Sequence, residues 1–187
     1  MEQTKKRINL LPVVPLRGKV AFPHTSISFE VGREMTLKSV QRALDNADKL
    51  VFICTQKVTE KDEISGSDLY TVGCVAKIKQ TAQLPAGAVR VLCEGLYRAK
   101  AREIVVEDGH FCAVAEEIVP MHGDEVLEEA YFRTAKALVK DVLSSDGKLG
   151  KEVVARMDNV RSADEYIDAA ISAMRVTLSV RISPTRY

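Results

Sequence analysis

The chain has 187 residues, which is enough for one ordinary domain or for a domain with an appendage. It carries 27 Lys and Arg against 26 Asp and Glu and has no Trp, and this charge balance and low aromatic content argue against a nucleic-acid partner. No apolar run approaches the ~20 residues of a membrane-spanning helix. The proline-broken run near the N-terminus has no signal-peptide cleavage site. We therefore expect a cytoplasmic protein with no membrane partner.

The first part of the chain is predicted to consist mainly of strands. Residues 10–24 read LLPVVPLRGKVAFPH, and the three prolines of this segment fit an edge strand and its exit, where a missing amide costs least. Pro85-Ala-Gly87 and Glu107-Asp-Gly109 are turn sequences. Short turns of this kind predict antiparallel sheets that curl into a barrel or sandwich. Apolar alternation predicts further strands at residues 25–31, 70–84, 89–96, 99–106 and 111–119, and a short apolar run predicts a buried strand at residues 50–55.

One helix is expected within this strand-rich part, at residues 33–47. Its apolar side chains recur at helical spacing and are expected to face the sheet: Leu37, Val40, Leu44 and Ala47. Its basic side chains are expected to remain in water: Arg33, Lys38 and Arg42.

After Pro120 the apolar period becomes helical, which predicts a boundary within residues 119–123 and domains at 1–120 and 121–187. A helix is expected over residues 124–144, and its apolar side chains fall on one face: Leu127, Ala130, Tyr131, Leu138 and Val142. Its acids come first, and Glu129 with Arg133 forms an i,i+4 pair. A second helix is expected at 150–158. A third begins at the capping box Ser162–Glu165, with an apolar stripe of Ile167, Ala170, Ile171, Met174 and Leu178.

The four cysteines recur at nearly equal intervals, at positions 54, 74, 93 and 112. Zinc sites usually bring their ligands in close pairs such as C-x-x-C, and the sequence has no such pair. Each cysteine lies in an apolar, strand-like run. We therefore interpret them as reduced thiols in the core and expect no metal site.

Catalytic motifs are missing from the sequence. It contains no H-E-x-x-H, no G-x-S-x-G and no G-x-x-x-x-G-K-[ST] phosphate loop. The stretch Asp146–Lys151 has its glycines too close together for a phosphate loop and follows a helix, so we interpret it as a helix terminator. The expected class is a binding or assembly module without catalytic residues.

An ordered series of motifs resembles the N-terminal domain of the Lon protease family. It starts with Leu11-Pro-Val-Val-Pro-Leu-Arg17, Phe22-Pro-His24 and Val31-Gly-Arg33. It continues with Asp68-Leu-Tyr-Thr-Val-Gly73, Val75-Ala-Lys-Ile-Lys79 and Leu84-Pro-Ala-Gly87. The most specific part is Val91-Leu-Cys-Glu-Gly-Leu-Tyr-Arg-Ala99, which is similar to the family's V-E-G-L-x-R-A signature, with Cys93 where valine is usual. The resemblance covers about residues 9–178, whereas residues 175–187 depart from the family.

This resemblance implies an α+β fold, a PUA-like β-pseudo-barrel with a packed helix followed by a C-terminal helical bundle or arm. It implies a non-catalytic domain that recognises unfolded or degron-bearing substrates and supports hexamer assembly. The parent would be an ATP-dependent serine protease that uses ATP and Mg. The alternatives are a standalone adaptor or ligand-binding domain, and an RNA binder, because PUA-like folds include RNA binders. The balanced charge argues against RNA.

A receptor for unfolded clients needs exposed apolar surface or a free sheet edge. The candidate contacts therefore come from the opening segment and from the 84–88 hairpin tip: Leu16, Arg17, Val20, Phe22, Leu84 and Pro85. For Leu16, Val20 and Phe22 the competing interpretation is a core position, and for Arg17, Glu94 and Arg98 it is a structural partner. Gly95 is expected at a bulge or a close backbone approach. The residues expected to mark the fold are Pro15, Pro23, Gly32, Gly73, Glu94, Gly95, Leu96 and Arg98.

Overall fold

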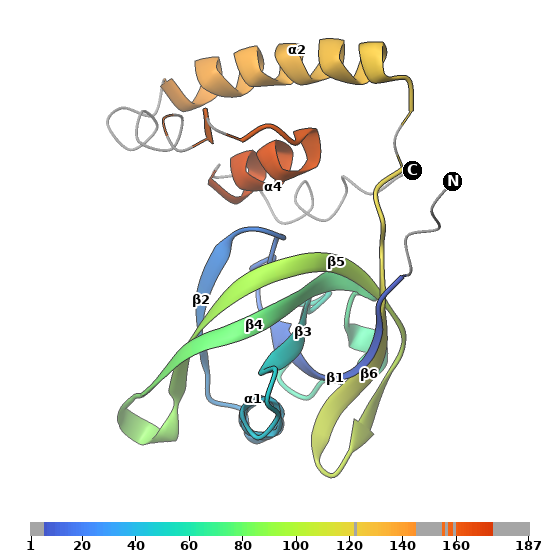
Figure 1. Ribbon diagram of the computed structural model, residues 1–187. Coiled ribbons are helices and arrows are strands. Elements are labelled where there is room, and N and C mark those ends of the chain that lie inside the picture. The colour runs from blue at the N-terminus through green and yellow to red at the C-terminus, as the bar shows by residue number, and fades with distance from the viewer. Residues whose placement is uncertain (1–5, 122, 145–154, 156, 159, 174–187) are drawn as a thin grey trace. The chain divides into compact units, whose positions relative to one another are not determined.

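The computed structural model describes residues 6–121, 123–144, 155, 157, 158 and 160–173. The chain divides into two compact units, residues 1–119 and 120–187, each of which is described by itself. The first unit contains six strands and one helix, and the second contains the described helices α2 and α4 (Figure 1). The predicted α+β class is confirmed. Among the described residues, no helix is long and apolar enough to cross a membrane.

The six strands of the first unit form one mixed sheet that closes on itself. They are β1 (Ile8–Leu16), β2 (Ser26–Val31), β3 (Leu50–Thr55), β4 (Val72–Gln83), β5 (Val89–Glu107) and β6 (His110–Glu117). Their order is β2-β5-β4-β3-β1-β6, and an additional pairing of β5 with β6 completes a barrel from which β2 extends as an edge (Figure 1). Closure removes the exposed edges of the other strands.

Strand β1 corrects the expectation that the proline-rich segment forms an edge. Residues 8–12 pair antiparallel with β6, and residues 13–16 pair parallel with β3. Strands β6 and β3 each pair with only one half of β1, so each half needs backbone amides for hydrogen bonds on one side only. This is how β1 accommodates Pro12 and Pro15 without lying at an edge of the sheet. The parallel pairing also corrects the expectation of antiparallel strands throughout.

Strand β5 is continuous where two strands were expected. Its pairing with β4 shifts register at Leu96, because Val75 pairs with Tyr97 and Ala76 with Gly95. A second shift, between Ala101 and Ile104, occurs in the pairing with β6. Bulges of this kind bend a strand sharply while it stays in the sheet, and this bending lets β5 pair with β2, β4 and β6 in turn (Figure 1).

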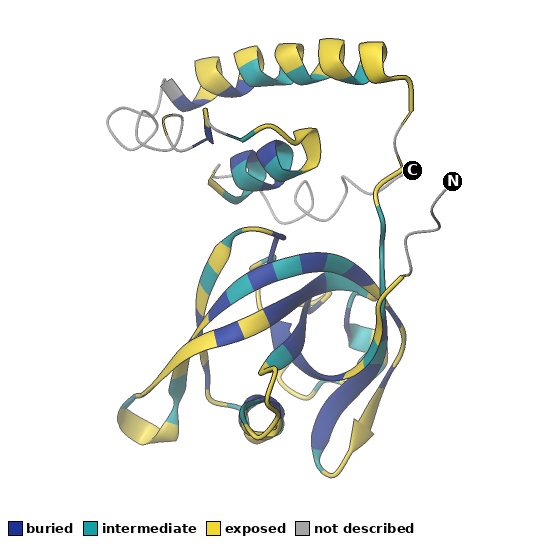
Figure 2. Ribbon diagram, in the orientation of Figure 1, coloured by how far each residue is buried: buried dark blue, intermediate teal, exposed yellow. Residues whose placement is uncertain are grey.

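The core of this unit lies on both faces of the central strands. Val13 and Val14 are neighbours in β1 but belong to two different hydrophobic clusters, as do Phe52 and Ile53 in β3. Burial on both faces explains why these strands are continuously apolar instead of alternating (Figure 2). The four cysteines are buried thiols that form no disulfide, as expected, and burial raises the pKa of the Cys54 and Cys93 thiols to about 12.

Helix α1 (Glu34–Leu44) packs Val40 and Ala43 into one of these clusters, with Thr36 and Ser39 also buried. Ala47 lies beyond its end and is exposed, so its expected place on the apolar stripe is wrong. Lys38 and Arg42 are exposed as expected, whereas Arg33 is half-buried and hydrogen-bonded, which corrects the expectation that it lies in water.

Helices α2 (Glu125–Ser144) and α4 (Ala163–Ala173) form the described core of the second unit. Asp124 caps α2 by accepting hydrogen bonds from the amides of Val126 and Leu127, both at 3.0 Å. The expected Glu129–Arg133 pair is present at 2.8 Å. At α4, the Glu165 amide donates to Ser162 Oγ, which is half of the expected capping box. The expected helix at 150–158 and the positions Met174 and Leu178 lie largely or wholly outside the described residues.

The apolar face that the sequence predicts for α2 is exposed. Leu127, Tyr131, Leu138 and Val142 are each more than half exposed, whereas Val139 and Leu143 on the adjacent face are buried with α4 (Figure 2). The contact of Phe132 with Tyr166, edge to face at 5.5 Å, lies on this buried face. Lys136 lies over both rings and donates to the Val160 carbonyl at 3.2 Å. These aromatic and cation contacts select one of the two apolar stripes for packing.

Candidate functional site

Two exposed segments leave the barrel side by side after β1 and β3. Parallel strands end at the same edge of a sheet, and here Leu16 pairs with Thr55. The Gln56 amide donates to the Leu16 carbonyl at 2.9 Å, and Thr55 Oγ1 donates to the Lys19 carbonyl at 2.8 Å. We call these two segments, residues 17–20 and 57–62, the rim surface; all of their residues are exposed except Val20 and Thr59, which are half-buried.

A fully buried side chain, Gln56, organises the second of these segments. Its Nε2 donates to the carbonyls of Val58 and Lys61, and its Oε1 accepts a hydrogen bond from Arg33 Nη1 at 3.1 Å. Arg33 Nη2 also donates to the Lys61 carbonyl at 3.0 Å. A buried amide with its hydrogen-bonding groups satisfied fixes the loop without an unpaired polar group.

The far end of the same loop is fixed by Asp68. Its carboxylate accepts hydrogen bonds from Lys61 Nζ at 2.8 Å and from the amide and hydroxyl of Ser65 at 2.8 Å. The hydrogen bond from Lys61, followed by those from Ser65, holds the pKa of Asp68 well below its usual range. A charged Asp68 at neutral pH thus stabilises the loop conformation in which the rim surface is formed.

Strand β2 lies beside the first segment of the rim surface. Lys19 Nζ donates to the Ser28 carbonyl of β2 at 3.2 Å. Because β2 is the last strand in the sheet order, its outer edge has no strand partner among the described residues. The rim surface thus presents exposed basic side chains and Val58, which is 53% exposed, next to a sheet edge that no strand covers.

The predicted contact residues divide into three groups. Leu16 and Phe22 are buried in the barrel, so the competing interpretation holds and they are withdrawn as client contacts. Arg17 is exposed and Val20 half-buried, and both lie on the rim surface. Leu84 is half-buried and Pro85 exposed at the β4–β5 turn, where Ala86 and Gly87 both have positive φ.

Most of the residues expected to mark the fold are buried, lie against a neighbouring strand or take part in a hydrogen bond. A Cβ at Gly95 would lie 2.1 Å from the Phe22 carbonyl oxygen, and one at Gly73 would lie 2.3 Å from the Ile53 carbonyl oxygen. Pro15 and Pro23 are buried, Leu96 is half-buried at the bulge, and the Arg98 carbonyl accepts from the Ile118 amide. Glu94 pairs with Lys79 at 2.7 Å, and this hydrogen bond lowers the pKa of Glu94. Gly32 is exposed, with only the Ala88 side chain within 4.0 Å.

The structural roles of three residues in this region were not predicted from the sequence: Gln56, Gly66 and Asp68. Ser65 and Asp68 form a capping box around the short 3₁₀ turn η1 (Gly66–Asp68), and the pattern S-x-x-D was a readable signal for it. A Cβ at Gly66 would lie 1.9 Å from the Ile104 carbonyl oxygen. Gln56 carries no sequence signal, because its importance comes from burial alone.

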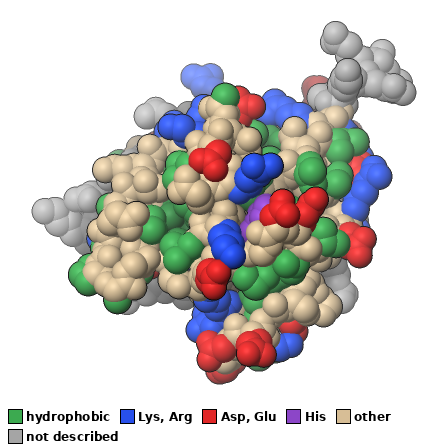
Figure 3. All heavy atoms as spheres, turned by 90° about the horizontal axis from the view of Figure 1, so that it is seen from below, with side chains coloured by type: hydrophobic (Ala, Val, Ile, Leu, Met, Phe, Trp, Pro, Cys, Tyr) green, Lys and Arg blue, Asp and Glu red, His purple; other side chains and the backbone are tan. Residues whose placement is uncertain are grey.

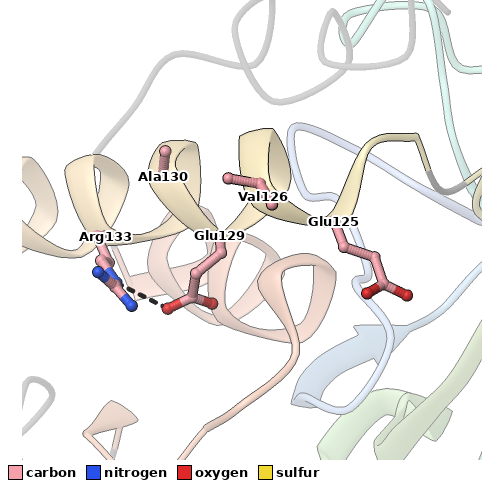
Figure 4. Close-up of a pocket in the computed structure, with 5 residues that line it drawn as sticks. All are labelled: Glu125, Val126, Glu129, Ala130 and Arg133. Carbon is pink, nitrogen blue, oxygen red and sulfur yellow. Dashed lines mark hydrogen bonds and ion pairs between the residues drawn. The ribbon is translucent and has the colours of Figure 1, made fainter.

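A shallow hollow on α2 offers little for chemistry. It is lined by Glu125, Val126, Glu129, Ala130 and Arg133, all from one side of the helix (Figure 4). Its guanidinium is already paired with Glu129 (Figure 4). Within the described ranges, no group of three or more His, Cys, Asp and Glu is placed to hold a metal ion.

Charge on the first unit is mixed in sign. On the face shown in Figure 3, acidic and basic side chains are interspersed with apolar ones. Nucleic-acid binders usually present a stripe of one sign. The mixed charge of this face agrees with the composition, and the absence of a nucleic-acid partner stays a prediction.

Comparison with solved structures assigns the class of the fold. The chain superimposes on the N-terminal domain of Mycobacterium avium complex Lon protease with a TM-score of 0.75 at 15% identity, over 92% of this chain and 87% of that one. The barrel with its edge strand and helical unit thus defines a domain of the Lon N-terminal fold.

The sequence assigns the family. Residues 10–183 match the ATP-dependent protease La (LON) substrate-binding domain, and the chain belongs to this family. It is 36% identical to the Lon protease of Clostridioides difficile over 174 residues and 34% identical to that of Escherichia coli K12 over 169 residues. These matches cover 90% of this chain but only 22% and 21% of the two relatives, so the chain spans about a fifth of their length.

Proposed function

We propose that this chain recognises unfolded or degron-bearing proteins through the rim surface and the adjacent edge of β2. The observation that carries the proposal is the outer edge of β2, which has no strand partner among the described residues and is contacted by Lys19 of the rim surface at the Ser28 carbonyl. Val58 adds an exposed apolar side chain to the rim surface. An extended client segment can add main-chain hydrogen bonds to such an edge and place alternate side chains on neighbouring apolar surface. Each such contact with one short client segment is weak, which suits a receptor that must release its client.

A binding measurement with an unfolded client tests this proposal. We expect a reduced, unfolded protein to bind and its native form not to bind, as followed by fluorescence anisotropy. Val58→Asp should weaken binding about fivefold, because it places a charge where apolar side chains dock. Val106→Asp is the matched control, since Val106 is 54% exposed on the β5–β6 hairpin outside the rim surface. Equal binding of native and unfolded forms, or equal effects of both valine variants, would contradict the proposal.

The parent protein proposed for this domain is an ATP-dependent serine protease of the cytoplasm. Its ATP and Mg would bind outside this chain, which carries no phosphate loop. In that arrangement this domain holds the client, other parts cleave it, and copies in the proposed hexamer add their weak contacts together.

We further propose that α2 contributes to assembly by pairing with α2 of a second copy. Its exposed stripe, Leu127, Tyr131, Leu138 and Val142, has the same spacing from either end, so an antiparallel copy places Leu127 opposite Val142 and Tyr131 opposite Leu138.

Molar mass by light scattering tests this pairing. We expect a concentration-dependent dimer of the chain, and Val142→Asp should shift it to monomer. Val126→Asp should not, because Val126 is exposed but lies off the stripe. The centre of the antiparallel register lies between Thr134 and Ala135, so Thr134→Cys brings two thiols close together and should form a disulfide-linked dimer. The pairing would be contradicted if the chain stays monomeric at high concentration, or if Val126→Asp and Val142→Asp lower the dimer fraction equally.

A further inference from the structure

Two guanidinium groups converge on one exposed carboxylate of the rim surface. Arg17, just after β1, forms an ion pair with Asp62 and also donates to the Lys61 carbonyl at 3.4 Å. Arg33, at the start of α1, lies 3.9 Å from the same oxygen of Asp62. Three segments distant in sequence thus meet at a single carboxylate oxygen.

The arginines and the carboxylate differ in how firmly they are held. Arg33 is 28% exposed and is fixed from below by the buried Gln56 and by the Lys61 carbonyl, at 3.1 and 3.0 Å. Asp62 is 85% exposed, and its carboxylate is largely hydrated even while paired. An exposed ion pair of this kind contributes little net free energy, so exchanging Asp62 for another carboxylate costs little. The arginines are the built part of the site, and Asp62 is the replaceable part.

We propose that Arg17 and Arg33 form a binding site for a carboxylate of the client, and that Asp62 occupies this site in the free domain. Planar guanidinium groups match carboxylates in geometry and charge, and Arg17 remains 43% exposed and accessible. Val20 and Val58 lie on the same two segments and provide apolar contact for side chains next to the carboxylate. The inference rests on the proposed client-binding function and adds the chemical group that is recognised.

Three matched peptides separate the possible sources of the carboxylate. The first is an apolar, acetylated decapeptide that ends in leucine with a free C-terminus, and the second is the same peptide with an amidated end. The third is amidated and carries one glutamate beside its last residue. Fluorescence anisotropy with the full chain measures each affinity. We expect the free-acid peptide to bind about fivefold more tightly than the amide, and the third peptide shows whether a side-chain carboxylate is also accepted.

Two substitutions should change this affinity in opposite directions. Asp62→Asn removes the internal competitor and should tighten binding of the free-acid peptide about two- to fivefold, because the site no longer has to be vacated. Arg17→Ala should weaken it about fivefold. The amidated peptide should respond to neither. The controls are Glu63→Gln, which removes the same charge one residue away, and Arg42→Ala, which removes an exposed arginine of α1.

The possible failures are distinguishable. If the free-acid and amidated peptides bind equally, the carboxylate site is wrong and client binding stands. If Glu63→Gln tightens binding as much as Asp62→Asn, the effect is general charge and the site is also wrong. If none of the peptides binds and the unfolded client does not bind either, the proposed function itself fails.

Discussion

Gly95→Ala is expected to destabilise the barrel by about 3 kcal/mol. A Cβ at this position would lie 2.1 Å from the Phe22 carbonyl oxygen and 3.1 Å from Cys74 Sγ. The backbone cannot move away, because the Gly95 carbonyl accepts from the His24 amide and the Gly95 amide donates to the Thr25 carbonyl, both at 2.9 Å. Unfolding in urea, monitored by circular dichroism, tests this: the urea concentration at the midpoint should fall, while the dependence of the free energy of unfolding on urea stays the same.

Gly32→Ala is the matched control for this substitution. A Cβ at Gly32 would meet only the Ala88 side chain, at 4.0 Å, which is an ordinary contact. Its unfolding midpoint should therefore stay the same or rise slightly, since alanine restricts the unfolded chain. If both variants lose the same stability, the close approach of Gly95 to Phe22 is not the reason that glycine is required there.

Gln56→Leu is expected to cost about 2 kcal/mol and to release the loop between β3 and β4. Leucine fills a similar volume but leaves the carbonyl of Val58 and one donor of Arg33 without the partners they have now. Limited digestion with trypsin should then cut after Lys57 and Lys61 much faster than in the unsubstituted chain, and the same samples can be unfolded in urea.

Gln41→Leu provides the comparison for this second result. Gln41 is exposed on α1 and its side-chain amide donates to the exposed Asp45 at 2.9 Å, so the loss of this side chain should change the free energy of unfolding by less than about 0.5 kcal/mol. The loop should remain protected from trypsin in this variant. Equal cleavage in both glutamine variants would mean that Gln56 does not hold the loop.

Local patterns predicted the elements of the first unit well, for physical reasons. Alternation marks a strand with one buried face, and it located β2 and β4 to within a few residues. Pro85-Ala-Gly87 and Glu107-Asp-Gly109 supplied the positive φ values that their turns require. These signals act within a few residues of one another and do not depend on the rest of the fold.

Features that depend on distant contacts were not predictable in this way. The apolar run of β1 is compatible with an edge or a central strand, and only its pairing with β3 and β6 decides between them. Likewise, α2 carries two apolar stripes, and the ring of Tyr166 determines which stripe is buried. The candidate contacts Leu16 and Phe22 are buried in the core, and this too depends on packing between segments far apart in the sequence.

Residue type and short-range spacing were enough to predict the turns and the apolar character of the four cysteines. The ordered series of motifs was enough to predict the family and, through it, the α+β class. Three features could be found only in the folded chain: the closure of the barrel, the role of Gln56 and the meeting of Arg17, Arg33 and Asp62. Each of them is created by segments far apart in the sequence, and no local pattern records which segments will meet.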